Sequence, residues 1–175
     1  MTTREPAEVV VTVGGNLADD IVSLRRNIEA GVERLSAAGF EVLRRSLWWR
    51  SQAWPNAGDP PFLNAVLLAR TSLQPEDALD ALQAVERQAG RQSGARNGPR
   101  PLDLHLITYG DVRLRTARLI LPHPRAADRL FVVGPLAEIA PDFRWPGDGR
   151  TAAALAAEAT VGLDARPERA EPPTG

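Results

Sequence analysis

Residues 97–105 bring together the side-chain types that bind phosphate and metal ions. A turn signal, Asn97-Gly98-Pro99, precedes Arg100, and the residues that follow alternate between polar and apolar as in a β-strand. With a period of two, Asp103 and His105 point to one face of this strand while leucines point to the other. An arginine followed by an acid and an imidazole on one strand face predicts a site where a phosphate group and a divalent metal ion meet.

Positive charge is concentrated in the same half of the chain. The net charge is −1, and the chain has no lysine, so all 21 basic residues are arginines. Between Arg87 and Arg129, nine arginines face three acidic residues, so this segment carries +6 and the remainder −7. Guanidinium groups bind phosphate in a bidentate manner, which predicts a polyphosphate ligand here. The near-zero net charge argues against nucleic acid or a membrane surface as partner.

Length and composition fit one globular domain. The chain has 175 residues, of which 43% are hydrophobic and 25% charged. We expect a single domain over residues 1–163 and a disordered tail over 164–175. Without cysteine, the chain can form neither disulfides nor thiolate metal sites. It lacks an apolar run long enough to span a membrane and the apolar core of a secretory signal. A cytoplasmic protein that acts as a monomer is expected.

The order of the expected elements indicates an α+β fold. Strands are predicted at 9–13, 40–50, 62–71 and 102–109, and helices at about 20–37, 75–89 and 151–160. A hairpin turn is expected at Gly110-Asp111 and a short helix between Pro124 and about Val133. The order strand, helix, strand, strand, helix, strand is typical of the ferredoxin-like split βαβ sandwich. It predicts a mostly antiparallel sheet with its helices on one face and substrate-binding loops on the other.

Six segments of the chain, taken in order, form a recognisable set of motifs. They are Val13-Gly14-Gly15-Asn16-Leu17, Pro61-Phe62-Leu63-Asn64-Ala65-Val66, Val85-Glu86-Arg87-Gln88-Ala89-Gly90-Arg91, Gly98-Pro99-Arg100-Pro101-Leu102-Asp103-Leu104-His105, Leu121-Pro122-His123-Pro124-Arg125 and Arg129-Leu130-Phe131-Val132-Val133-Gly134-Pro135-Leu136. Together they resemble the motifs of the 6-hydroxymethyl-7,8-dihydropterin pyrophosphokinase family. The resemblance implies transfer of pyrophosphate from ATP to 6-hydroxymethyl-7,8-dihydropterin, giving AMP and the pterin diphosphate, in folate biosynthesis.

The resemblance also implies roles for residues on the nucleotide side. Asp103 and His105 fall where the family holds Mg²⁺, two ions in the family, with ATP as co-substrate. Asp103, Arg91 and Arg100 are the implied catalytic residues. The implied ATP-binding residues are Gln83, Glu86, Arg91, Arg100, Arg118, His123 and Arg129. For His123, between two prolines, an ordinary surface-loop histidine is the alternative.

On the pterin side, the resemblance implies binding by Ser51, Gln52, Trp54, Asn64 and Phe131. Asn64 lies among apolar strand neighbours, where an amide is costly unless it has partners, and its donors and acceptor match the edge of a pterin ring. Phe131 corresponds to an aromatic residue that stacks on the ring. For Phe131 and Trp54, packing in the core is the alternative.

Several positions depart from the family pattern, most of them on the nucleotide and metal side. His105 stands where the family has a second aspartate, and an imidazole is a softer, uncharged ligand that suits Mg²⁺ poorly. Gly15 and Pro101 replace a serine and a threonine, and Ser93 replaces an arginine. A catalytically impaired homologue that binds pterin or nucleotide without efficient transfer is therefore an alternative. An unrelated ferredoxin-like RNA-binding module lacks support, because its aromatic strand signature is missing. A Walker-type nucleotide site is also unsupported, because the chain has no G-x-x-x-x-G-K-[ST] motif and no lysine.

Overall fold

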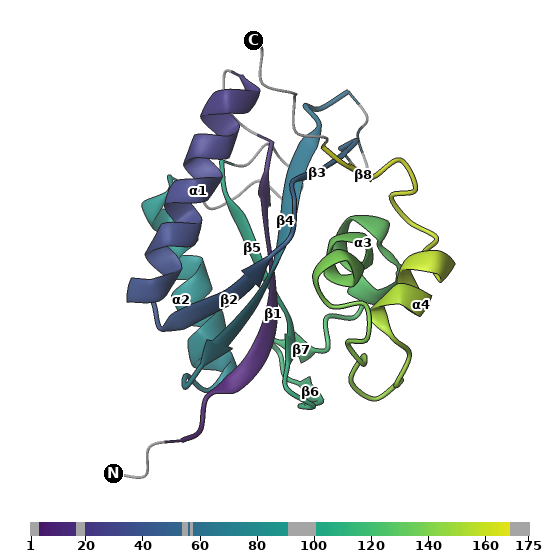
Figure 1. The fold of residues 1–175 in the computed structure, drawn as a ribbon. Coiled ribbons are helices and arrows are strands. Elements are labelled where there is room, and N and C mark those ends of the chain that lie inside the picture. The colour runs from purple at the N-terminus through teal and green to yellow at the C-terminus, as the bar shows by residue number, and fades with distance from the viewer. Residues whose placement is uncertain (1–3, 17–19, 54–55, 57, 91–100, 169–175) are drawn as a thin grey trace.

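A six-stranded antiparallel sheet forms the centre of the molecule (Figure 1). The computed structural model describes residues 4–16, 20–53, 56, 58–90 and 101–168. The strands are β1 (Ala7–Gly15), β2 (Phe40–Arg45), β3 (Trp49–Ser51), β4 (Phe62–Thr71), β5 (Asp103–Tyr109) and β8 (Arg166–Pro167). Their order is β5-β1-β4-β3-β8, β2 also pairs with β4, and each of these pairings is antiparallel. The predicted α+β fold with a mainly antiparallel sheet is confirmed.

Helices α1 (Ile21–Ala37) and α2 (Pro75–Gln88) cover one face of the sheet (Figure 1). Asp20 caps α1 by accepting a hydrogen bond of 2.8 Å from the backbone N–H of Ser23. The chain turns after this helix at Gly39, whose φ of 98° favours glycine. Alternate side chains of β1, among them Val9 and Val11, pack against these helices in the larger core. The described helices are all too short or too polar to cross a membrane.

The other face of the sheet carries helices too, so the expectation that the helices lie on one face was wrong. Helix α3 (Leu130–Ile139), helix α4 (Ala152–Glu158) and a 3₁₀ turn at Ala126–Asp128 pack there (Figure 1). Val10 of β1 and Val66 of β4 form a second core with these helices. The central strands β1 and β4 are apolar on both faces, so both faces must be covered. Only part of this face is left for a ligand.

Two strand connections differ from the prediction. The strand expected over 40–50 is split into β2 and β3 at Ser46, which is buried. Its backbone N–H donates to the carbonyl of Val66 at 3.0 Å, and its hydroxyl accepts from the N–H of Val66 at 2.9 Å. The prediction of a hairpin at Gly110 was also wrong, although the chain does turn there. After that turn, β6 (Leu114–Arg115) pairs with β7 (Ile120–Leu121) instead of returning along β5.

The helix expected to end near Val133 instead begins at Leu130 and continues to Ile139. Arg129 has extended backbone angles, φ −99° and ψ 113°, and separates the helix from the preceding 3₁₀ turn. Pro135 lies inside the helix and removes one backbone donor. The helix nonetheless continues because Leu136 is fully buried in the second core.

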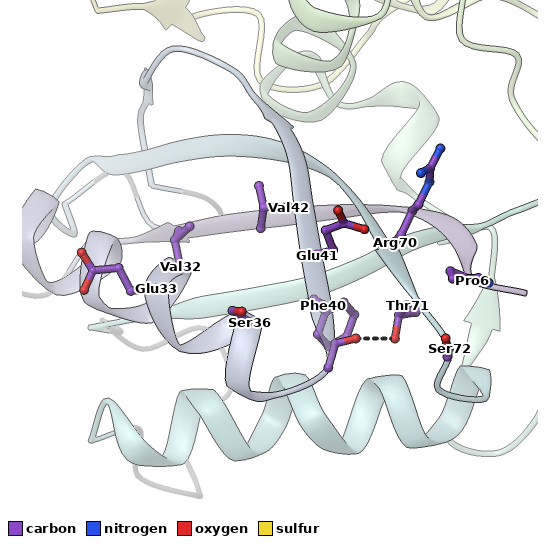
Figure 2. A pocket seen from close by; sticks show the side chains of 11 residues that line it. Pro6, Val32, Glu33, Ser36, Phe40, Glu41, Val42, Arg70, Thr71 and Ser72 are labelled. Atoms are coloured by element: carbon purple, nitrogen blue, oxygen red, sulfur yellow. Dashed lines mark hydrogen bonds between the residues drawn. The ribbon is translucent and has the colours of Figure 1, made fainter. Parts of the chain in front are cut away.

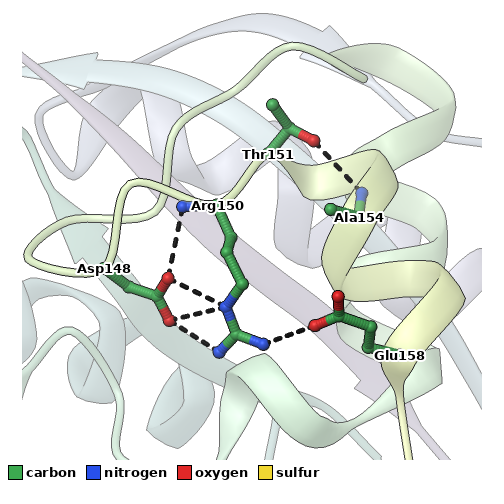
Figure 3. A network of polar contacts seen from close by, with 5 residues as sticks. All are labelled: Asp148, Arg150, Thr151, Ala154 and Glu158. Carbon is green, nitrogen blue, oxygen red and sulfur yellow. Dashed lines mark hydrogen bonds and ion pairs between the residues drawn. The ribbon is translucent and has the colours of Figure 1, made fainter.

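The C-terminal region is held in place by polar contacts. Thr151 caps α4 by accepting from the backbone N–H of Ala154 at 3.1 Å, and Arg150 bridges Asp148 and Glu158, at 2.8 and 2.6 Å (Figure 3). These carboxylates raise the pKa of the Arg150 guanidinium. Residues 164–168, which belong to the segment expected to be a disordered tail, are ordered: β8 pairs with β3. The rest of that segment lies outside the described residues.

Candidate active site

Three neighbouring strands place an acid and an amide on either side of a glycine. Gly14 of β1 lies opposite Asn64 of β4 and, on its other side, opposite Asp103 of β5. Two residues along, on the same face of the sheet, Thr12 lies opposite His105. The apolar neighbours Leu104 and Leu106 are buried in the core under α1 and α2. The predicted alternation in β5 is therefore confirmed.

A cleft of about 660 Å³ opens above this part of the sheet, beside α3. Eight of the residues implied by the resemblance line it, and they come from β3 and the loop after it, β4, β5, the loop after β7 and the start of α3. They are Ser51, Gln52, Asn64, Asp103, His105, His123, Arg129 and Phe131. Residues from both the pterin and the nucleotide sides of the prediction thus lie in one cavity.

The acid and the imidazole on β5 contact each other. His105 Nε2 lies 2.8 Å from Asp103 Oδ2, and the imidazole side chain is 44% exposed against 16% for the carboxylate. Within the described residues, no three His, Cys, Asp or Glu side chains are grouped as a complete metal site. Mg²⁺ is commonly held by one or two carboxylates together with substrate phosphates and water. The donor set therefore fits an ion that binds together with a polyphosphate, and Asp103 is the carboxylate of β5 that such an ion could use.

His123 faces His105 across the same cavity. The two rings are 5.9 Å apart in an edge-to-face arrangement. The Arg125 backbone N–H donates to His123 Nδ1 at 3.3 Å, so the proton of the neutral ring is on Nε2. Burial, aided by His105, Arg129 and Arg125, lowers the pKa of His123 to about 4. At neutral pH the ring is therefore an uncharged Nε2 donor, suited to a phosphate or ribose oxygen.

This low pKa predicts that His123 weakens the fold in acid. The unfolded chain binds the proton near pH 6.5 and the folded chain only near 4, so the free energy of unfolding falls as the pH drops from 6.5 to 4. Allowing for partial exposure, we expect the free energy of unfolding to fall by about 2 kcal/mol more in wild type than in His123→Gln between pH 7.0 and pH 4.5. Urea unfolding of both proteins at both pH values measures this difference. Equal losses in the two proteins would contradict it.

Arg129 and Phe131 project from the start of α3. The Arg129 guanidinium lies 5.7 Å from the centroid of the Phe131 ring. Burial, together with the nearby charge of Arg125, lowers the pKa of Arg129. Because the guanidinium is partly desolvated and lies near a second arginine, an anion in the cleft would be bound more strongly than at an open surface. Asn64 of β4, which also lines the cleft, donates a hydrogen bond from its side-chain amide to the Ser51 hydroxyl at 3.3 Å. The cleft thus combines a cationic region with an aromatic ring and an amide.

Arg118 lies apart from this group. It lines a neighbouring cavity of about 290 Å³, into which His105 and His123 also project, together with Leu104 and Ile120. Its guanidinium forms ion pairs with Asp80 and, at 3.6 Å, with Glu76 of α2. The contact with Asp80 raises the pKa of Arg118. The two histidines connect this smaller cavity to the cleft.

Not every implied residue lies in the cleft. Glu86 is 3% exposed and accepts a hydrogen bond of 2.7 Å from the backbone N–H of Leu104, so it supports β5 from the α2 side. Gln83 is exposed on α2 and is not among the residues that line the cleft. Arg91, Arg100 and Trp54 lie outside the described residues.

The sequence reasoning did not identify some of the residues that line the cleft, namely Thr12, Phe62, Ile107, Arg125, Ala126, Asp128, Val132 and Val161. Thr12 had a detectable signal, because it is a polar residue within a buried apolar strand and shares a strand face with Gly14. Val161 had none, because it approaches the cleft only through the path of the C-terminal segment.

A third cavity lies between the end of α1 and strands β2 and β4 (Figure 2). It has a volume of about 580 Å³, and the oppositely charged Glu41 and Arg70 stand opposite each other at its edge. None of the implied site residues lines it.

A cationic cleft with a carboxylate, an aromatic ring and an amide, built on an antiparallel α+β domain, is typical of a protein that binds a phosphorylated small molecule. The model of the 7,8-dihydro-6-hydroxymethylpterin-pyrophosphokinase family matches residues 10–141. A Synechocystis 2-amino-4-hydroxy-6-hydroxymethyldihydropteridine pyrophosphokinase is 44% identical over 142 residues, covering 81% of this chain and 71% of that protein. The Pseudomonas aeruginosa protein of the same name is 40% identical over 142 residues, which cover 81% of this chain and 85% of that protein.

Solved structures show the same fold. A Plasmodium falciparum HPPK-DHPS with pterin and p-hydroxybenzoate superimposes with a TM-score of 0.66 at 8% identity, covering 90% of this chain and 44% of that one. The chain therefore spans less than half of that larger protein. With the family model and the sequence relatives, the conclusion is plain: the chain belongs to the 7,8-dihydro-6-hydroxymethylpterin-pyrophosphokinase family. Enzymes of this family are diphosphotransferases of folate biosynthesis that use ATP with Mg²⁺.

Proposed function

We propose that this chain transfers pyrophosphate from ATP to 6-hydroxymethyl-7,8-dihydropterin in the cleft beside α3, releasing AMP. The hydroxymethyl oxygen attacks the β-phosphorus and its proton is released to solvent, the bond from that phosphorus to the oxygen bridging the α-phosphate breaks, and AMP leaves with that oxygen and its electron pair. The observation that carries the proposal is the convergence of Asp103, His123 and Arg129 with Asn64 and Phe131 on one cavity.

The cleft and the smaller cavity beside it each bind one substrate in this proposal. The pterin ring stacks on Phe131, and its polar edge hydrogen-bonds to Asn64 and to the loop at Ser51 and Gln52. The nucleotide occupies the smaller cavity beside Arg118, which places its triphosphate near the two histidines. This arrangement aligns the acceptor hydroxyl and the phosphate chain, and alignment provides much of the catalysis in such transfers.

The phosphates are bound by this chain's own cations. Arg125 and Arg129 contribute guanidinium groups, and His123 contributes its Nε2–H donor. Asp103, with His105 beside it, would hold Mg²⁺, and we propose two ions. When bound, Mg²⁺ neutralises charge on the phosphate oxygens.

Other features of the proposal follow from the fold. The element order β1, α1, β2, β4, α2, β5 supports the ferredoxin-like description. A monomer is proposed as the active form. ATP and the hydroxymethyl-dihydropterin are the partners proposed.

A coupled AMP-release assay with Mg²⁺ and the dihydropterin tests the proposal. We expect AMP formation that depends on both substrates in wild type. The His105→Asp variant should reach half-maximal rate at about tenfold less Mg²⁺, because a second carboxylate is a better ligand for this ion than an imidazole. Wild type should be relatively more active with Mn²⁺ or Co²⁺ than this variant.

Two results would contradict the proposal or a part of it. Pterin binding in calorimetry without any AMP release would indicate a binding protein that does not catalyse the transfer. An unchanged Mg²⁺ requirement in His105→Asp would remove His105 from the metal site while leaving the transfer itself in place.

A further inference from the structure

The C-terminal segment crosses one end of the cleft and connects its two walls. We define residues 160–168, which follow α4 and end in β8, as the C-terminal strap (Figure 1). The strap lies outside residues 10–141, the part matched by the family model. It contacts the start of α3, which contributes Phe131 to the cleft, and the loop after β3, which contributes Gln52.

The strap first binds the wall that leads into α3. The backbone N–H groups of Thr160 and Val161 donate to the carbonyl of Asp128, at 3.0 and 2.9 Å. The N–H of Leu130 donates to the carbonyl of Val161, also at 2.9 Å. These bonds hold Arg129 in its extended conformation, since they bracket it on both sides. Val161 itself lines the cleft.

Gly162 then packs directly against the Phe131 ring. A Cβ atom at this position would lie 2.5 Å from Phe131 Cδ1 and 2.9 Å from Cε1, closer than real side chains approach. The residue also has a φ of +69°, which favours glycine. The backbone of the strap therefore limits where the ring can lie on the side facing Gly162.

Farther along, the strap binds the opposite wall. Asp164 Oδ2 accepts a hydrogen bond of 2.6 Å from the backbone N–H of Gln52, the residue after buried Ser51. The next strap residue, Ala165, is buried. The carboxylate of Asp164 thus fixes the backbone of the loop that borders the pterin end of the cleft.

The end of the strap is anchored at several points. Glu168 donates its backbone N–H to the carbonyl of Trp48 at 2.7 Å, and its carboxylate pairs with Arg25 of α1 and, at 3.4 Å, with Arg50 of β3. A segment fixed at both ends sets the separation of the walls that it connects.

We propose that the strap determines the width of the pterin end of the cleft, with Gly162 and Asp164 as positioning residues for Phe131 and for the Gln52 backbone. The ligand class is a flat bicyclic heterocycle, held between a ring fixed by Gly162 and a loop fixed by Asp164. This inference rests on the proposed function, since it concerns how the same cleft selects its acceptor. Within the strap, the backbone of Thr160 and Val161 contacts the segment around Arg129, whereas Gly162 and Asp164 contact Phe131 and the Gln52 backbone, so changes at these two residues should affect the pterin and not the nucleotide.

Removal of the Asp164 acceptor tests one contact. Asp164→Ala should raise the Kd of the dihydropterin roughly tenfold, measured by calorimetry with a saturating non-hydrolysable ATP analogue, because the loop loses a charge-assisted hydrogen bond. Asp164→Asn keeps an acceptor oxygen and should restore binding to about threefold of wild type. Leu163→Ala, which truncates an exposed neighbour in the strap, is the matched control and should bind normally.

Gly162→Ala tests the other contact. The added Cβ should displace the Phe131 ring and raise the dihydropterin Kd by about tenfold or more. The matched control is Gly149→Ala: this glycine also has a positive φ, +77°, but nothing lies within 4 Å of its Cβ position. The control carries the same kind of backbone strain away from the cleft and should leave pterin binding unchanged.

The readout that identifies positioning is selectivity between ligands. In all four strap variants, the Kd of the ATP analogue measured alone should stay within about twofold of wild type, since the arginines are untouched. Equal weakening for pterin and nucleotide, or normal pterin binding in Gly162→Ala and Asp164→Ala, would overturn the proposal. A wild-type protein that binds no dihydropterin at all would instead overturn the proposed function.

Discussion

Asp103→Asn is expected to reduce kcat/KM for AMP formation roughly a thousandfold. The carboxylate is 16% exposed, lies at the start of β5 and is the main oxygen donor on the strand face that borders the cleft. The amide keeps the shape and removes the charge, so the phosphates lose the ion that this residue would hold. Charge neutralisation of this kind provides several kcal/mol in phosphoryl-type transfers.

The loss should be specific to charge at this position. Asp128→Asn, in the same cleft but exposed, and Asp111→Asn, at the turn after β5, are the controls and should keep activity within about tenfold of wild type. Dihydropterin affinity without metal should be unchanged in Asp103→Asn. If Asp103→Asn retained more than a tenth of wild-type kcat/KM, Asp103 would not be the principal metal ligand.

The alternation of β5 could be predicted because a half-buried strand has a period of two, which put Asp103 and His105 together and the leucines into the core. The limits of β4, 62–71, also followed from the sequence, since a leucine-rich apolar run is preceded by prolines and followed by a helix signal. Local patterns of this kind fix which face a side chain occupies. They say much less about what covers that face.

Long-range packing accounts for what the sequence did not predict. The β-branched run 9–13 indicated a central strand, and a central strand with both faces apolar also requires helices on both faces. That second requirement was missed, and α3 and α4 were not expected to pack there. The path of the strap depends on hydrogen bonds between residues such as Gln52 and Asp164, which are far apart in the sequence and carry no local signal.

Gly14→Ala is expected to raise the dihydropterin Kd about thirtyfold. A Cβ on Gly14 would lie 2.4 Å from Asn64 Oδ1 and 2.8 Å from the carbonyl oxygen of Leu63. Because β1 is paired on both sides, the strand cannot move away, so the Asn64 amide must turn out of its position between Gly14 and Ser51. The free energy of unfolding should also fall by about 1–3 kcal/mol, as in other overpacked sites. Calorimetry and urea unfolding measure the two effects.

A double-mutant cycle with Asn64→Ala separates the effect of Gly14→Ala on the Asn64 side chain from its effect on the strand backbone. If Gly14→Ala acts on binding by displacing Asn64, the Asn64→Ala variant should weaken pterin binding to a similar extent, and the combined variant should bind no worse than either one. The stability cost of the contact with the Leu63 carbonyl should remain in the combined variant, since that atom belongs to the backbone. Additive losses in pterin affinity would show that Gly14 affects the cleft by another route, with Asp103 on its opposite side as the next residue to test.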